Sequence, residues 1–256
     1  MTLSNDESRQ AAYFAAQIEN LSLRAAKSGI VLYSDFLTLP QQKLAEHAAK
    51  RAGCGILLYG GTKDSQRKIA AFAKNAADIA EDEFPLMIVK VEFDKRFMTE
   101  ELTHRDFLGA LMHMSIRREM IGDIVIGDEQ AYLFLHEKTA MYVLGELESV
   151  KHTPVTAMLA ESCPLSAAPK FEEMTVTVSS MRADCIAARI MRGSRNDALE
   201  AIRLKSVKVD EVTVTKPDQN IREGEEISVR GYGKFRIGTT APTKKGRIAV
   251  TIFQYK

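Results

Sequence analysis

Residues 182–209 read RADCIAARIMRGSRNDALEAIRLKSVKV, which predicts two short helices followed by the first of several short strands. ADCIAARI forms the first helix and RNDALEAI the second, which begins after Ser194, a preferred N-cap residue. Asp197 follows three residues later, at capping-box spacing. The later segments VTV, ISVR, FRIG and IAVTIF read as strands, so the sequence predicts a compact αα-plus-β module.

This helical pair is rich in cations, with only Asp184, Asp197 and Glu200 opposing them. Arg195 lies in the first turn of the second helix, where a cation is unfavourable to the helix dipole, so we expect a compensating partner such as phosphate. An ordinary charged surface is the alternative. The cations of the expected RNA-binding face are Arg182, Arg189, Arg192, Arg195, Arg203, Lys205 and Lys208.

The net charge of the whole chain conceals a difference in charge between its C-terminal part and the remainder. The 256 residues contain 35 Lys and Arg against 34 Asp and Glu, a net charge of +1. Residues 180–256 hold 16 of these cations and 9 of the carboxylates, a net of +7, and the remainder therefore has a net of −6. This division predicts a polyanion-binding module attached to an acidic body.

The composition excludes several classes of protein. With 45% apolar residues the chain reads as soluble and globular, and no apolar run approaches the roughly 18 residues of a membrane helix. The polar start, SNDESRQ, is unlike a signal peptide, and the three cysteines form no CxxC pair, so we expect a cytoplasmic protein with no membrane contact.

Residues 1–84 predict a small α/β domain, with helices from Ser4 to Gly29, Thr38 to Gly53 and Asp64 to Ala77, and a strand at Gly55–Tyr59. Residues 85–165 predict a second domain in the order β-α-β-β-α-β, which is typical of the ferredoxin-like fold. SCPLSAAPK reads as a linker to a third domain, residues 171–256. The expected fold class is α+β multidomain, with an α/β unit, a ferredoxin-like middle domain and a C-terminal αα-plus-β domain.

Fragments that imitate catalytic motifs fail on their context. His104-Arg105-Asp106 starts like a kinase catalytic loop, but Leu111 stands where the metal-binding Asn belongs. GILLYGGT has phosphate-loop glycine spacing, but Gly61 replaces the required Lys. The five histidines show no metal-ligand spacing. We therefore expect no catalytic residue, no metal and no cofactor.

Other residues offer secondary RNA contacts. RGYG at 230–233 begins like the RNA-stacking motif of RRM domains and then departs from it, so Tyr232 is an optional stacking residue in a glycine turn. The turn KKGR could follow a phosphate backbone. The arginines of the middle domain have two equally plausible roles. They contact RNA, or they form salt bridges with Asp106, Glu119 and Asp123. The secondary candidates are Arg105, Arg117, Arg118, Tyr232, Lys244, Lys245 and Arg247.

Two segments resemble known families. LTHRDFLGALMHMSIRREMIGDI, residues 102–124, resembles the motif of the YlmH family, and residues 178–237 resemble the S4-type RNA-binding domain. The resemblance implies an RNA-binding ferredoxin-like middle domain and a C-terminal S4-type domain. Carried over residue by residue, it implies RNA contacts for Ser194 as well as for Arg182, Arg195, Arg203 and Lys208.

The chain departs from the S4-type pattern at two positions. Asp197 stands where a basic residue is usual, which removes a phosphate contact. Lys205 stands where Gly is usual before the VxV strand, in a turn that Gly makes more easily.

The resemblance implies non-catalytic binding of structured RNA, either ribosomal RNA or tRNA on the ribosome. Its specific form is quality control of large ribosomal subunits obstructed by an unfinished peptidyl-tRNA. Two alternatives remain open. One is an RNA-modifying enzyme that uses the S4-type domain for substrate delivery, and the other is an adaptor whose N-terminal domain recruits a protein partner to RNA.

Overall fold

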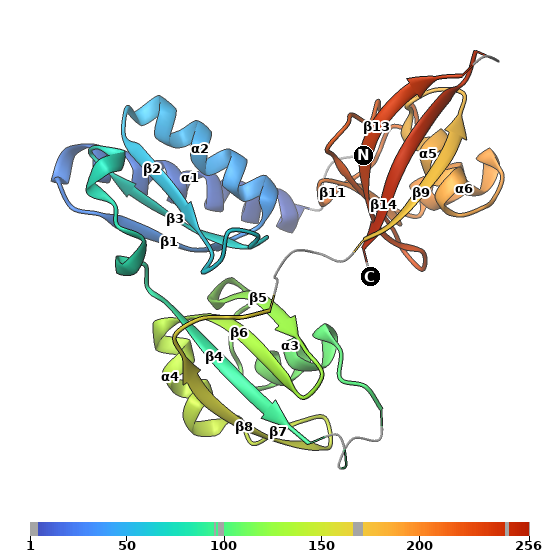
Figure 1. Cartoon of the computed structure of the whole chain (residues 1–256). Helices are drawn as coiled ribbons and strands as arrows, with labels where there is room; N and C mark the ends of the chain where they lie inside the picture. Colours follow the sequence, from blue (N-terminus) through green and yellow to red (C-terminus); the bar gives the residue numbers. More distant parts are fainter. Residues whose placement is uncertain (1–4, 95, 97–99, 166–170, 244–245, 256) are drawn as a thin grey trace. The chain divides into compact units, whose positions relative to one another are not determined.

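The computed structural model describes residues 5–94, 96, 100–165, 171–243 and 246–255 (Figure 1). The chain divides into two compact units, residues 2–168 and residues 169–256. Helices and three antiparallel sheets build them, so the α+β multidomain class is confirmed. None of the helices among these residues is long and apolar enough to cross a membrane.

The first part of residues 2–168 is a three-stranded antiparallel sheet accompanied by two helices. The first helix ends before Gly29 and the second before Gly53, both in the left-handed conformation with φ of 68°, as the sequence predicts. Thr38 is the N-cap of the second helix. The strand order is β1-β3-β2, and the elements are α1 (Asn5–Ser28), β1 (Leu32–Leu37), α2 (Leu39–Ala52), β2 (Gly55–Tyr59) and β3 (Lys68–Ala73).

Strand β3 lies where the sequence pattern predicted a helix from Asp64 to Ala77, so that prediction was wrong. Residues 69–72 are 0% exposed, because the strand is covered on both faces. Such a strand lacks the alternation of apolar and polar residues by which a half-exposed strand is recognised. Its alanines favour a helix intrinsically, but burial on both faces outweighs this small preference.

The second part of this unit has the predicted element order β-α-β-β-α-β. Helix α3 begins after Thr103, which forms a capping box with Asp106, as its spacing predicts. A two-residue strand, β7, adds to the edge, and the sheet order is β5-β6-β4-β8-β7. The elements are β4 (Leu86–Phe93), α3 (His104–His113), β5 (Ile121–Ile126), β6 (Gln130–His136), α4 (Glu137–Glu146), β7 (Ser149–Val150) and β8 (Thr153–Ala160).

The two sheets of residues 2–168 share one hydrophobic cluster. Phe36 and Ile69 of the first sheet pack with Ile88, Tyr132 and Phe134 of the second. Helices α1 and α2 pack on the other face of the first sheet, and α3 and α4 on the other face of the second (Figure 1). The result is four layers in the order helices, sheet, sheet, helices. The boundary predicted between residues 84 and 85 thus falls inside one compact unit.

Polar contacts reinforce this packing. Arg67 donates from Nε to the Ile121 carbonyl (2.8 Å) and from Nη2 to the Phe36 carbonyl (3.0 Å). The Asp123 carboxylate accepts the backbone N–H groups of Gln66 (2.6 Å) and Arg67 (3.2 Å). Burial raises the pKa of Asp123, although these bonds act against the rise. The loop between β2 and β3 is therefore bonded to β5 as well as packed beside it.

Residues 169–256 form a six-stranded antiparallel sheet with two helices on one face. Both helices occupy the segments that the sequence predicts. The sheet order is β11-β10-β12-β13-β14-β9, and the elements are β9 (Phe171–Val178), α5 (Ala183–Ile190), α6 (Arg195–Arg203), β10 (Val207–Val209), β11 (Val212–Thr213), β12 (Glu226–Val229), β13 (Gly233–Pro242) and β14 (Ile248–Tyr255).

The core of this unit lies between the helices and the inner face of the sheet. Ile186 of α5 and Ile202 of α6 pack against Val207, Ile227 and Ile252 of three strands. The inward side chains alternate along each strand with outward polar ones, such as Lys208 in β10. The helices therefore expose one charged surface, and the outer face of the sheet exposes another.

Candidate nucleic-acid interface

The centre of the predicted interface is a buried carboxylate, Asp184, at the start of α5. Its side chain is 0% exposed and binds two of the predicted arginines. Arg182 donates from Nε to Oδ1 (3.1 Å) and from Nη2 to Oδ2 (3.0 Å). Arg195, on α6, donates from Nε to Oδ2 (2.9 Å), with Nη2 at 2.8 Å. The carboxylate thus holds two cations of the interface side by side.

These bonds keep Asp184 ionised. Burial acts to raise its pKa, but the hydrogen bonds from Arg182 and Arg195 outweigh burial, and the pKa lies below its ordinary value. The same contacts correct the interpretation of Arg195. Its position in the first turn of α6 is compensated by Asp184 inside the protein, so it needs no phosphate for that purpose.

Ser194 and Asp197 form the predicted capping box at the start of α6. Ser194 Oγ accepts the Asp197 N–H (3.2 Å), and Asp197 Oδ2 accepts the Ser194 N–H (2.7 Å). Asp197 Oδ2 also accepts the Ser194 hydroxyl (2.8 Å), which holds the pKa of Asp197 below its ordinary value. The Ser194 hydroxyl is therefore engaged within the protein.

Arg203 is also paired, but at the surface. It binds Glu200 with two bonds, from Nε (2.8 Å) and Nη2 (2.6 Å), and the two side chains are 72% and 51% exposed. A pair this exposed contributes little to stability and exchanges readily with solvent. Glu200 is thus a competitor that a phosphate would displace from Arg203.

Three further predicted cations, Arg189, Arg192 and Lys205, are exposed and have no ion pair with any described residue. Arg192 follows α5 and Lys205 follows α6, both in the left-handed conformation with φ of 51° and 56°. Glycine makes this turn with less strain, so the cations are retained at a conformational cost. Their charge at the C-terminal end of a helix is favourable to the dipole, which offsets part of that cost.

Lys208 does not share this surface, because it points from the outer face of the sheet. Its register partner is Ser228 of β12, which pairs in turn with Lys234 of β13. A cavity of about 320 Å³ lies here, lined by these three residues with Glu211 and Glu226. Lys234 binds Glu226 at 2.6 Å. The predicted residues therefore divide between two faces of the C-terminal unit.

The turn that contains Tyr232 lies beside the exit of α6. Arg230 N–H donates to the Ser206 carbonyl (2.9 Å), next to Lys205 in the sequence. Tyr232 is 46% exposed, as a ring that stacks on a base must be. Arg230 is also exposed and was not singled out from the sequence, where only its place in the motif RGYG pointed to it. Arg247 is exposed near the tip of the β13–β14 hairpin, and Lys244 and Lys245 lie outside the described residues.

The secondary candidates of residues 85–165 differ in their surroundings. Arg105 is exposed on α3 and has no ion pair within the described parts of the chain. Arg117 pairs with Asp35 of β1 (3.6 Å), and Arg118 donates to the Ile121 carbonyl (2.6 Å). Salt bridging is thus observed for Arg117, but with a partner that lies far away in the sequence. Asp106, the partner considered from the sequence, binds Lys151 instead (3.0 Å).

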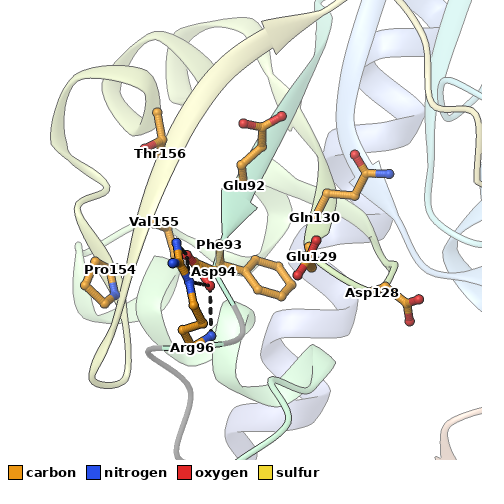
Figure 2. Close-up of a pocket in the computed structure, with 10 residues that line it drawn as sticks. All are labelled: Glu92, Phe93, Asp94, Arg96, Asp128, Glu129, Gln130, Pro154, Val155 and Thr156. Atoms are coloured by element: carbon orange, nitrogen blue, oxygen red, sulfur yellow. Dashed lines mark hydrogen bonds and ion pairs between the residues drawn. The ribbon is translucent and has the colours of Figure 1, made fainter.

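An acidic cavity of about 880 Å³ lies at one end of the second sheet (Figure 2). Arg96 binds Asp94 through Nε (2.8 Å), and Glu92, Asp128 and Glu129 are among the other residues that line the cavity (Figure 2). Carboxylates repel phosphates, so this face is unsuited to RNA. Within the described residues no group of three or more His, Cys, Asp or Glu side chains could hold a metal ion.

Comparisons with known proteins relate part of this chain to a described family. Residues 80–162 match the family described as "Putative RNA-binding domain in YlmH", so this part of the chain defines the class of its domain. The resemblance of residues 102–124 to the YlmH family is confirmed, because these residues lie within the matched segment.

The chain is 28% identical to "Ribosome-associated protein quality control protein P2" of Bacillus subtilis (strain 168). The aligned segment of 225 residues covers 87% of each chain. The solved structure "Cell division protein ylmH from Streptococcus pneumoniae" is 18% identical. It matches with a TM-score of 0.49 over 62% of this chain and 94% of that one.

Proposed function

We propose that this chain is a non-catalytic RNA-binding protein that associates with the ribosome. The observation that carries the proposal is the cationic surface of α5 and α6, where Arg182 and Arg195 are held in place and Arg189, Arg192 and Lys205 are exposed. Arginine forks and lysines in this arrangement bind the phosphates of a structured RNA. The match of residues 80–162 to an RNA-binding domain supports the same function independently.

The C-terminal unit acts in this proposal as an S4-type domain. Two short helices, α5 and α6, precede β10, and the strands that follow curl into a sheet beneath them. The order of the elements and the sequence resemblance of residues 178–237 both support this assignment. RNA lies across the helices, with Tyr232 available to stack on an unpaired base at one end.

The middle domain is proposed to be ferredoxin-like, which its strand order β8-β4-β6-β5 supports. RNA-binding domains of related topology stack bases on the open face of the sheet. Here part of that face packs on the first sheet, with Tyr132 4% and Phe134 0% exposed, and its uncovered part carries the exposed carboxylate of Glu92. We therefore infer that this domain meets RNA through its helical side, where Arg105 is exposed.

The RNA is proposed to be ribosomal RNA or tRNA on the large ribosomal subunit. The name of the Bacillus subtilis relative, with its reference to ribosome-associated quality control, supports this partner and a cytoplasmic location. In this role the protein recognises a large subunit that carries an unfinished peptidyl-tRNA. The N-terminal α/β part keeps the middle domain folded, since the two share a core.

A second candidate function is that of an adaptor that recruits a protein partner to RNA. The acidic cavity of Figure 2 favours it, because Asp128 and Glu129 would attract a basic segment of a protein, whereas Glu92 already pairs with Lys90. The residues that line this cavity lie between Glu92 and Thr156, whereas the sequence led us to expect a protein contact in residues 1–84. The two functions are compatible, but they predict different losses in the same experiment.

The test measures binding of the full chain to ribosomal RNA, tRNA and DNA over a range of salt concentrations. Arg189→Gln and Lys205→Gln are each expected to weaken RNA binding and to lower the salt slope by about 1. Lys74→Gln, an exposed cation in the other unit, is the control and should change neither. An unchanged slope in both variants would refute the proposed face.

Two further measurements address the alternatives. Co-sedimentation with large subunits should fall in the same two variants if RNA holds the protein there. Retained co-sedimentation with lost RNA affinity would favour the adaptor. Mass spectrometry of RNA from cells with and without the protein tests the modifying enzyme, because a missing modified nucleoside would contradict non-catalytic binding.

A further inference from the structure

We propose that Asp184 is a positioning residue, which fixes Arg182 and Arg195 as a fork for one RNA phosphate before RNA arrives. This inference rests on the proposed RNA-binding function and goes further by naming the residue that organises the contact. Asp184 itself is 0% exposed, so it acts only through the two arginines.

The backbone holds the carboxylate in place. The Asp184 N–H donates to the Pro217 carbonyl (3.0 Å), and the Ala183 N–H donates to the Gln219 carbonyl (2.8 Å). The loop before β12 therefore satisfies the first free N–H groups of α5, which leaves Asp184 at a fixed point between α5 and α6. A carboxylate anchored in this way can orient the groups that bind to it.

The remaining donors of the two arginines are free to bind a ligand. Each guanidinium uses Nε and Nη2 on Asp184, and neither Nη1 group has an acceptor among the described residues. A guanidinium carries five N–H donors, so both keep donors for a second acceptor. Their side chains are 37% and 57% exposed, which lets a ligand reach them. With two positive charges and one negative, the group retains a net charge of +1.

A phosphate is the ligand that fits these properties. Planar arginine forks bind phosphate oxygens with paired hydrogen bonds. Ordering two long side chains in advance removes much of the entropy cost that binding would otherwise incur. Arg203 differs, because its partner Glu200 is 51% exposed, so that pair lacks a buried carboxylate to anchor it.

A positioning role and a purely electrostatic role for Asp184 predict opposite changes in RNA affinity when the carboxylate is removed. If the carboxylate only neutralises the arginines, then Asp184→Asn adds a net positive charge and RNA should bind more tightly. If the carboxylate positions them, the same change frees both side chains, and RNA should bind more weakly. The sign of the change in affinity therefore separates the two roles.

The experiment measures the affinity of the full chain for tRNA and ribosomal RNA in wild type, Asp184→Asn and Glu200→Gln. The fraction folded is checked at the assay temperature. Asp184→Asn is expected to weaken binding about tenfold, which corresponds to about 1.4 kcal/mol. Glu200→Gln removes a carboxylate from an exposed pair and should leave binding unchanged or tighten it. Tighter or unchanged binding by a folded Asp184→Asn would overturn the positioning role.

A second pair of variants serves if Asp184→Asn does not fold. Arg195→Lys keeps the charge but loses the fork, whereas Arg189→Lys keeps the charge of an unpaired cation. Arg195→Lys should bind about tenfold more weakly at every salt concentration with the salt slope retained, and Arg189→Lys should stay within about twofold. Equal effects of the two changes would overturn the proposal. Absence of RNA binding by the wild type would instead refute the proposed function itself.

Discussion

Gly122 of β5 lies against Phe36 of β1, so the packing of the two sheets can be tested by a double-mutant cycle. A Cβ atom on Gly122 would lie 2.6 Å from Cε1 and 2.8 Å from Cζ of Phe36. Carbon atoms in good contact are about 3.5–4.0 Å apart, and the Phe36 side chain is 1% exposed and closely packed. Gly122→Ala is therefore expected to lower the free energy of unfolding by about 1–3 kcal/mol through overpacking.

Phe36→Leu removes the ring atoms that would clash and is expected to cost about 1–1.5 kcal/mol alone. In that background Gly122→Ala should cost at least about 1 kcal/mol less than in the wild type, a coupling typical of residues in contact. Urea unfolding of the four proteins, followed by circular dichroism, measures this coupling.

Gly109 in α3 is the matched control, because a Cβ there would meet no atom within 4 Å. Gly109→Ala should raise the free energy of unfolding by about 0.5–1 kcal/mol, equally in both backgrounds. If Gly122→Ala and Phe36→Leu were additive within about 0.5 kcal/mol, the face-to-face packing of the sheets would be refuted.

Three other predictions concern the C-terminal unit. Arg192→Gly and Lys205→Gly relieve the strain of a left-handed backbone conformation. Thermal unfolding should therefore give a free energy of unfolding equal to that of the wild type within about 0.5 kcal/mol, or higher, while RNA binding weakens. A larger loss of stability would mean that these cations have a structural role. The pKa of Asp184 lies below its ordinary value near 3.9, so its stabilising effect is present above about pH 4 and is lost in more acidic solution. The difference in unfolding free energy between wild type and Asp184→Asn should shrink below that pH, and a constant difference would contradict the ion pairs. Tyr232→Ala should weaken binding to single-stranded RNA by about 1–3 kcal/mol and leave duplex binding and stability unchanged, whereas equal losses for both RNAs would exclude stacking.

The predictions from sequence succeeded where local chemistry decides the structure. Ser194 with Asp197 and Thr103 with Asp106 start helices at the expected positions, and Gly53 ends one. These signals depend on backbone groups within four residues, so no tertiary information is needed to read them. The strand content of residues 85–165 was likewise readable from apolar runs bounded by turns.

The predictions failed where distant parts of the chain decide it. Strand β3 is apolar on both faces only because the second sheet covers one of them, which no local pattern reveals. For the same reason, the sequence did not show which cation pairs with which carboxylate. Arg195 meets Asp184 across two helices, and Arg117 meets Asp35 across the two sheets. A count of charges identified the cationic segment but not which of its members were already bound.

The shared core of the two sheets also sets an order of events during synthesis. Translation completes β3 at Ala73 well before it reaches Phe134 in β6, which covers the same core. At about 5–20 residues per second, the nascent chain needs roughly 3–12 s to extend over that interval. During this time the first sheet has an apolar face without its final cover. The N-terminal part is therefore expected to complete its folding only when β6 has emerged, and a pause between these strands would prolong its exposure to chaperones.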